Sequence, residues 1–198
     1  MARSRCRLRG TMLRLGDGSF ARLASGSLAL LLLAACGGSI PGPTVTSPFT
    51  ARDQQLFDDG LDLMEDPDAL HGQWRTDWER ELTERLDRSD AIVEGDVISV
   101  HEDSDPDQRT SYRVILSVRK VHRGELGPGV TEVSLMAREG SLGYGSIASN
   151  PERILRLPFV AFMKYAEAPV RPVPHFHLTP PSLALRRALS VLDKEKKD

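Results

Sequence analysis

The stretch Ala91-Ile92-Val93-Glu94-Gly95-Asp96-Val97-Ile98-Ser99-Val100 decides the fold, because the patterning of the chain changes there. Before it, apolar residues recur with a period of about 3.6, which is typical of helices; from Ala91 onward the period is close to two. Isoleucine and valine dominate the stretch, and Gly95 indicates a bulge or bend. We therefore predict that a sheet begins at residue 91.

The segments after this stretch also have strand patterns separated by turns. Residues 112–118 alternate apolar and polar side chains, apart from Ile115 on the polar side. Residues 131–137 and 159–163 predict two more strands. Residues 175–178 predict a short edge strand, because three prolines precede them. The predicted strands thus lie within 91–178.

Helical patterns lie on both sides of the strands. Thr50 and Asp53 form a capping pair for a first helix, and Asp66-Pro67 ends it and begins a second helix that runs to about residue 88. A last helix follows over 181–193, and 194–198 is a charged tail.

The second predicted helix carries an apolar stripe at every fourth position. Core packing is the favoured role of this stripe, and an aromatic ligand platform made by its two tryptophans is the alternative. The stripe consists of Leu70, Trp74, Trp78, Leu82 and Leu86.

This order of elements predicts one α+β domain over 50–193, with helices over 50–88, strands over 91–178 and a helix over 181–193. We expect a small curved antiparallel sheet or an OB-like barrel of four to five strands, flanked by N-terminal helices and a C-terminal helix.

Residues 1–35 have the pattern of a secretory signal, in which Arg14 and Arg22 precede an apolar run that ends at Ala35. The run is too short to span a bilayer, which takes roughly 20 apolar residues. Translation from Met1 or from Met12 would both give a complete leader.

The stretch Leu33-Ala34-Ala35-Cys36, which spans the end of the leader, resembles the lipobox of bacterial lipoproteins. The resemblance implies cleavage before Cys36, a lipid on its thiol, and a lipid bilayer as partner through the Cys36 anchor. An ordinary signal with a nearby cysteine is the alternative. Residues 36–49 then form the lipidated cysteine and a flexible linker. Many lipoproteins that are retained in the inner membrane have an aspartate after the lipidated cysteine. This chain has Gly37 there, so the resemblance favours the outer membrane.

A second resemblance concerns the domain itself. Residues 89–100, 112–124 and 158–162 resemble strands of netrin-like, metalloproteinase-inhibitor-like OB barrels. The resemblance implies a barrel fold. It implies no inhibitory residue, because that family uses a disulfide-held N-terminal cysteine and the N-terminal Cys36 is expected to carry lipid.

Charge and cysteine content exclude several classes of function. The leader through residue 35 holds six arginines and one aspartate, so residues 36–198 have 20 basic and 27 acidic side chains, a net charge of −7. This balance argues against nucleic acid as a partner. The sequence has two cysteines. Cys6 is expected to be removed with the leader and Cys36 to carry lipid, so no thiol remains for a disulfide, a zinc cluster or a nucleophile. We predict no cofactor.

Two features of the strand region are candidate sites. His175 and His177 are two positions apart, so on a strand both imidazoles lie on one face, as a metal site requires. Tyr144, in the glycine-rich segment 140–145, is predicted to be exposed on a surface loop and is a candidate binding residue. Paired acids such as Asp58-Asp59 are interpreted as surface carboxylates.

No catalytic constellation stands out, so we expect a non-enzymatic, membrane-anchored envelope lipoprotein with a binding domain. The expected partner is an envelope protein or another envelope component. The alternative is a tethered metal-binding protein or enzyme that uses His175 and His177.

Overall fold

The structure is a computed structural model, and it describes residues 45–195 except 63, 65 and 170. These residues belong to one compact unit. The predicted leader, Cys36 and the first part of the predicted linker lie outside the described residues. Within the described ranges, no helix is both long enough and apolar enough to cross a membrane.

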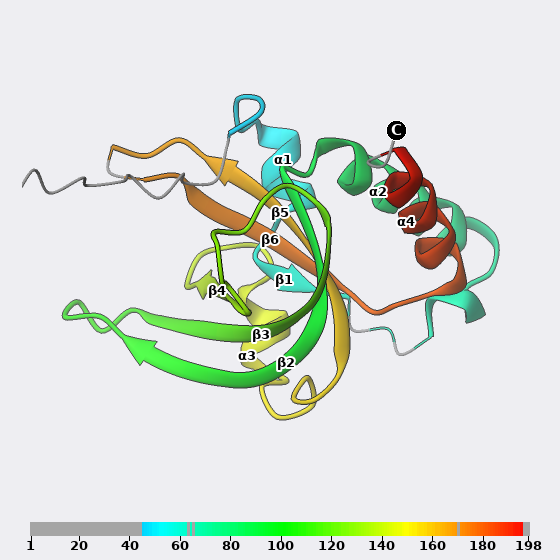
Figure 1. The fold of residues 1–198 in the computed structure, drawn as a ribbon. Coiled ribbons are helices and arrows are strands. Elements are labelled where there is room, and N and C mark those ends of the chain that lie inside the picture. The colour runs from blue at the N-terminus through cyan, green and yellow to red at the C-terminus, as the bar shows by residue number, and fades with distance from the viewer. Residues whose placement is uncertain (1–44, 63, 65, 170, 196–198) are drawn as a thin grey trace, which may run out of the picture. The chain divides into compact units, whose positions relative to one another are not determined.

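The described unit is α+β, with a curled, half-barrel sheet and helices beside it (Figure 1), as the sequence predicts, but the sheet has six strands rather than four to five. The helices are α1 (Ala51–Leu56), a 3₁₀ helix η1 (Pro67–Ala69), α2 (Gly72–Arg88), α3 (Tyr144–Ala148) and α4 (Leu183–Glu195). The strands are β1 (Gly60–Leu61), β2 (Ala91–Ser104), β3 (Thr110–Arg123), β4 (Glu132–Arg138), β5 (Pro158–Ala166) and β6 (Val173–Thr179).

The strands form one sheet in the order β1-β6-β5-β2-β3-β4. All neighbours are antiparallel except β1, which pairs with β6 in parallel. The predicted irregularity at Gly95 is confirmed, since the β2–β3 register shifts between Glu94 and Gly95. A Cβ at Gly95 would lie 2.1 Å from the carbonyl oxygen of Ser117, so the bulge needs glycine.

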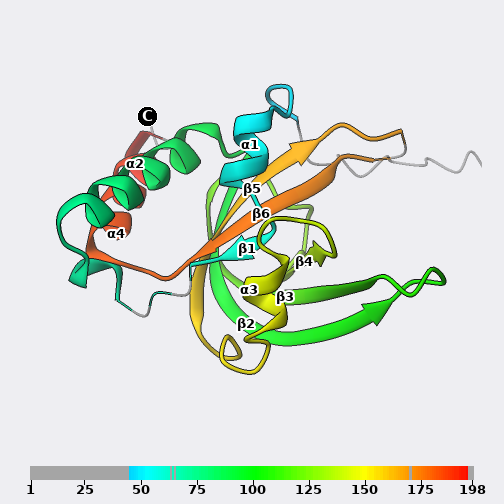
Figure 2. The ribbon, with the colours of Figure 1, turned by 180° about the vertical axis from the view of Figure 1, so that it is seen from behind.

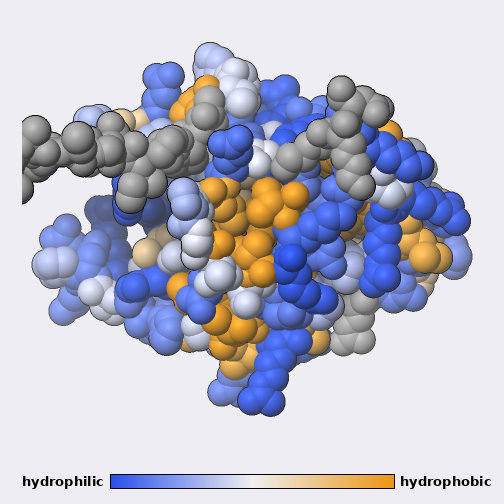
Figure 3. Space-filling view, in the orientation of Figure 1, coloured by the Kyte–Doolittle hydropathy of each residue, from blue (hydrophilic) through white to orange (hydrophobic). Residues whose placement is uncertain are grey.

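β5 is buried on both faces, and this explains its near-continuous apolar run. Along β5, Phe159, Ala161 and Met163 join the core that also contains Ile147 of α3. Val160 and Phe162 join a second core beneath α1, α2 and α4. Figure 2 shows α2 and α4 side by side from behind. Figure 3 shows an apolar area near the middle of the face seen in Figure 1, surrounded by hydrophilic side chains.

The prediction that residues 175–178 form an edge strand is wrong. β6 lies between β5 and the two-residue β1, where Gly60 pairs with His177 and Leu61 with Leu178. A strand of two residues leaves no periodic signal, so the sequence does not reveal the neighbour of β6.

The first helix is shorter than predicted. The capping box of Thr50 and Asp53 is present, but α1 ends at Leu56, and Leu61 lies in β1. Asp66 does cap a helix with Pro67 at its first position, but this helix is the 3₁₀ turn η1, and α2 begins only at Gly72.

The predicted core packing of the two tryptophans is confirmed for Trp78 and wrong for Trp74. Trp78 is 8% exposed and packs in the second core, whereas Trp74 is 78% exposed. Residues four apart on a helix with 3.6 residues per turn differ by about 40° in direction, so the stripe leaves the buried face within a few steps. Trp74 lies in the first turn of α2, beyond that buried face.

Both predicted boundaries of the last helix differ from the structure, in which α4 runs from Leu183 to Glu195. α4 includes Lys194 and Glu195, which the sequence assigns to the charged tail. Its start is fixed by Ser182, whose Oγ accepts a hydrogen bond from the Leu185 amide at 3.0 Å.

The last residues of the predicted linker contact the domain. Lys164 is 1% exposed, and its Nζ donates hydrogen bonds to Asp90 Oδ1 and Ser47 Oγ, each at 2.8 Å. Thr46 donates to the same aspartate through its amide and its hydroxyl. This buried ion pair therefore holds residues 46–47 against β5.

Candidate functional site

A cavity of about 550 Å³ opens where the end of β1 meets the start of β5 and the segment after β6. This volume lies in the range of roughly 300–1,000 Å³ that is common for small-molecule and cofactor sites. Its lining residues, which define the β1–β5 pocket, are Leu61, Asp62, Met64, Asn150, Arg153, Ile154, Leu157, Pro158, Phe159, Pro180 and Pro181.

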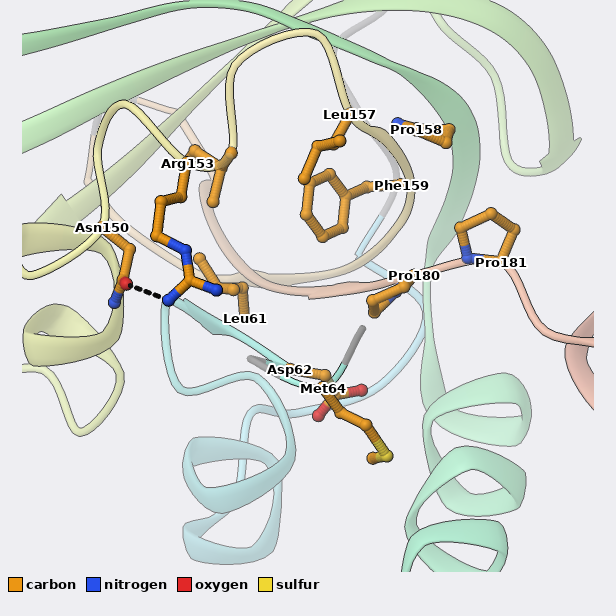
Figure 4. Close-up of a pocket in the computed structure, with 11 residues that line it drawn as sticks. Leu61, Asp62, Met64, Asn150, Arg153, Leu157, Pro158, Phe159, Pro180 and Pro181 are labelled. Atoms are coloured by element: carbon orange, nitrogen blue, oxygen red, sulfur yellow. Dashed lines mark hydrogen bonds between the residues drawn. The ribbon is translucent and has the colours of Figure 1, made fainter. Parts of the chain in front are cut away.

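The pocket combines apolar walls with a few polar groups. Figure 4 shows Leu157 and Phe159 on one side and Asp62 and Met64 on the other. Arg153 lies at a third side, where its Nη1 donates a hydrogen bond to Asn150 Oδ1 at 3.4 Å (Figure 4). A mainly apolar surface with a few polar side chains is the usual composition of a ligand site.

Prolines explain why the pocket forms at this end of the sheet. Pro158 begins β5, and Pro180 and Pro181 follow β6, whose last residue Thr179 pairs with Val160. A proline has no N–H to donate to a neighbouring strand, so the pairing stops there. β1 ends at Leu61, so the neighbouring strand is also too short to fill the space.

Asp62 connects the pocket to a buried imidazole. His177 Nε2 lies 3.0 Å from Asp62 Oδ1, and His177 Nδ1 lies 2.8 Å from Asp58 Oδ1. The other oxygen of Asp62 accepts a hydrogen bond from Trp78 Nε1 at 3.2 Å. The His177 side chain is only 5% exposed and does not line the pocket. A ligand in the pocket therefore meets Asp62 and not the histidine.

The environment keeps Asp62 ionised. Burial raises the pKa of its carboxyl, but the hydrogen bond and charge of His177, the charge of Arg85 and the Trp78 hydrogen bond outweigh burial and lower the pKa to about 2. Burial and the Arg85 charge lower the pKa of His177, but its hydrogen bonds to Asp58 and Asp62 raise it above its ordinary value. Both nitrogens of His177 are thus placed to donate protons.

Arg85 completes the charge balance behind the pocket. Its Nε donates to the Leu56 carbonyl at 3.1 Å and its Nη2 to Glu81 Oε2 at 3.3 Å. Its Nη1 lies 3.9 Å from Asp62 Oδ2 and has no hydrogen-bond partner among the described residues. With His177 protonated, Asp58, Asp62 and Glu81 face two cations, which leaves one net negative charge.

His175 and His177 share one face of β6, but each contacts different aspartates. His175 Nδ1 lies 3.2 Å from Asp59 Oδ2, and His177 is bound by Asp58 and Asp62. In the described ranges, no group of three or more histidine, cysteine, aspartate or glutamate side chains has the geometry to hold a metal ion.

The interpretation of Asp58-Asp59 as surface carboxylates is therefore wrong. Asp59 is 1% exposed, has a φ of 58°, and its Oδ1 accepts a hydrogen bond from the Phe176 amide at 3.2 Å. The two aspartates follow α1 and reach the histidines because β1 pairs with β6. Local sequence does not reveal this long-range contact.

Tyr144 is the first residue of α3 and is half-buried, rather than exposed on a loop. Its ring contacts that of Tyr112 in a tilted arrangement, with centroids 5.7 Å apart. The glycine-rich segment brings Gly143 against Gly60, where a Cβ on Gly143 would lie 2.4 Å from the Gly60 Cα. The segment therefore supports β1, and Tyr144 does not line the β1–β5 pocket.

Sequence reasoning misses the pocket residues Asp62 and Arg153. One available signal is segment 58–68, which holds six acidic residues and no basic one. Another is Pro180-Pro181 directly after a strand. Neither signal identifies Arg153, which comes from the irregular segment before β5.

The fold and the pocket define the class of this protein as an α+β half-barrel domain with a ligand-sized pocket among its described residues. A comparison with models of protein families finds no match for the chain. A search of curated proteins finds none either.

Proposed function

We propose that the mature chain is a lipid-anchored envelope protein whose domain binds a partner, without catalysing a reaction, in the β1–β5 pocket. The observation that carries this proposal is the apolar cavity of about 550 Å³ with Asp62 and Arg153 on its walls. The anchor part of the proposal rests on the sequence Leu33-Ala34-Ala35-Cys36.

The chemistry of the pocket supports binding over catalysis. A carboxyl with a pKa of about 2 is a weak base, so Asp62 is poorly matched to general acid–base work near neutral pH. His177 has both nitrogens engaged by carboxylates and lies behind Asp62. A metal bound by both histidines would have to displace Asp58 or Asp62 from His177, because carboxylates engage both nitrogens of that imidazole.

The strand connections are compatible with the OB-like interpretation of the domain. β2, β3 and β4 form a meander, α3 follows, and β5 returns to pair with β2 before β6 pairs with β5. An OB barrel is a five-stranded, partly open Greek-key barrel, and β2 to β6 are five consecutive strands of this sheet. Membership of the netrin-like group is a proposal based on the sequence resemblance alone.

The anchor is tested by replacing Cys36. In cells grown with a labelled fatty acid, the parent protein should incorporate the label and remain with membranes, with the outer membrane favoured. Cys36→Ser should lose the label and appear in the soluble fraction. Unchanged labelling of the Cys36→Ser variant would contradict the anchor.

The pocket is tested by photo-crosslinking in cells. A photoreactive amino acid at position 157, on the pocket wall, should give a defined adduct. The same amino acid at position 155 is the matched control, because Leu155 is 36% exposed, two residues away and outside the lining. Identical adducts from both positions, or no adduct from position 157, would contradict binding in the pocket.

A further inference from the structure

We infer that the β1–β5 pocket takes a partner polypeptide segment in which a lysine or arginine side chain is flanked by apolar residues. This inference rests on the proposed function and adds the chemical class of its ligand. The cationic head group would lie against Asp62, and the neighbouring apolar side chains would contact the walls around Leu157 and Phe159.

Asp62 is the group that would bind the cation, because its carboxylate stays charged and has limited access to water. Its side chain is 15% exposed, and its pKa is lowered to about 2, so it is ionised at any physiological pH. His177 and Trp78 each use one carboxylate oxygen, and each oxygen keeps a second acceptor site. A charge-assisted hydrogen bond at such a site is stronger than one in open water.

The charges around Asp62 also favour a cation. Behind it, His177 and Arg85 are balanced by Asp58 and Glu81, so the group retains one negative charge when His177 is protonated. Along the chain, segment 58–68 adds further carboxylates and no basic residue. A ligand carboxylate near Asp62 would be repelled.

Arg153 is the basic residue of the pocket and opposes the binding of a cation. Its exposed position makes its charge act less strongly on a ligand than the charge of Asp62 does. It is an exposed residue in the segment before β5, and it donates to Asn150 Oδ1 at 3.4 Å. Exposed charges are screened by water and salt, so their pairing contributes little. Arg153 therefore discriminates less between ligands than the largely buried Asp62 does.

The apolar walls select the rest of the ligand. Ile154 and Phe159 are each 3% exposed and belong to the core, whereas Leu157 is 46% exposed at the rim. A lysine stem with apolar neighbours covers such a surface while its ammonium reaches a carboxylate. A lone simple amine would leave the rim uncovered.

The test is an NMR titration of residues 36–198 carrying Cys36→Ser, which retain every described residue. The probes are acetyl-Leu-Lys-Leu-amide and matched peptides with norleucine or glutamate at the centre. We expect the lysine peptide to bind at least about tenfold more tightly than the norleucine peptide, as one charge-assisted hydrogen bond predicts. The glutamate peptide should bind most weakly. Octylammonium, as a free amine, should bind more weakly than the lysine peptide.

Variants separate the ligand class from the pocket. Asp62→Asn should reduce the preference for lysine over norleucine to about twofold or less. Asp66→Asn, which removes an exposed carboxylate of the same segment outside the lining and leaves an oxygen to cap η1, should keep the preference. Leu157→Lys should block all the peptides, and Leu155→Lys should block none.

Each failure has its own meaning. Equal binding of the three peptides, a preference for glutamate, or tighter binding of octylammonium would overturn the lysine or arginine ligand and leave the pocket as a site. No binding of any probe, or binding that Leu157→Lys leaves unchanged, would overturn the proposed pocket itself. Retained lysine preference in Asp62→Asn would overturn the role of Asp62.

Discussion

Asp62 and His177 share a hydrogen bond of 3.0 Å that joins the wall of the pocket to the interior of the domain. Asp62 lines the pocket, and His177 lies on β6 with its other nitrogen on Asp58. The imidazole therefore fixes the segment after α1 from two points. Any change that weakens the hydrogen bonds of His177 should loosen the pocket wall at Asp62, which the proposed ligand contacts.

The first prediction concerns the pH dependence of stability. The pKa of His177 is raised in the folded protein, so its stabilising contribution is complete below its unfolded pKa of about 6.5 and is lost as pH rises through the folded value. We expect the free energy of unfolding to fall with increasing pH above about 6.5. Urea unfolding at several pH values measures this slope.

His177→Gln should flatten this slope, because glutamine does not titrate. His101→Gln is the control, since His101 is exposed on β2. Equal slopes for the parent protein and His177→Gln would contradict the ionic role of this imidazole.

A second prediction concerns the contact between two glycines. Gly143→Ala should destabilise the protein by about 1–3 kcal/mol, because its Cβ would lie 2.4 Å from the Gly60 Cα, where no side chain can move aside. Gly145→Ala, two residues away, meets nothing within 4 Å and should be neutral or slightly stabilising. Thermal unfolding of the two variants compares them, and equal melting temperatures would contradict the close packing of α3 on β1.

A third prediction concerns the cap of α1. Asp53 forms the capping box with Thr50 and accepts a hydrogen bond from Arg88 Nε at 2.7 Å. Burial raises the pKa of Asp53, but the hydrogen bonds from Arg88 and Thr50 outweigh it and lower the pKa to about 2. Asp53→Ala should therefore cost about 1–3 kcal/mol in chemical denaturation. Asp107→Ala, at an exposed turn, should change stability little.

A fourth prediction concerns residues 46–47. Ser47→Ala removes one partner of the buried Lys164 ammonium and should destabilise the protein by about 1–3 kcal/mol. Ser104→Ala at an exposed strand end is the matched control. A Ser47→Ala variant as stable as the control would mean that these residues do not hold to the domain in solution.

The sequence predicts the class of fold because strands and helices have different periods. The change of period at Ala91 and the capping box of Thr50 are local signals, and both correspond to element starts in the structure. The apolar run Phe159–Met163 is also local, since a strand buried on both faces has no polar side.

The candidate site depends on contacts that local sequence does not carry. Asp58 and Asp62 meet His177 across more than 100 positions of sequence, through a parallel pairing of two residues. The histidine pair looks like a metal site in the sequence because its aspartate partners lie far away along the chain. The two-residue β1 gives no periodic signal from which to predict them.

The most direct test of the account maps where a ligand binds. In the titration with acetyl-Leu-Lys-Leu-amide, the account predicts that backbone amide shifts concentrate at Leu61, Asp62, Ile154 and Phe159 around the pocket. Shifts centred instead on the exposed Trp74 or Ile98, with the pocket amides unchanged, would contradict the central claim that the β1–β5 pocket is the binding site.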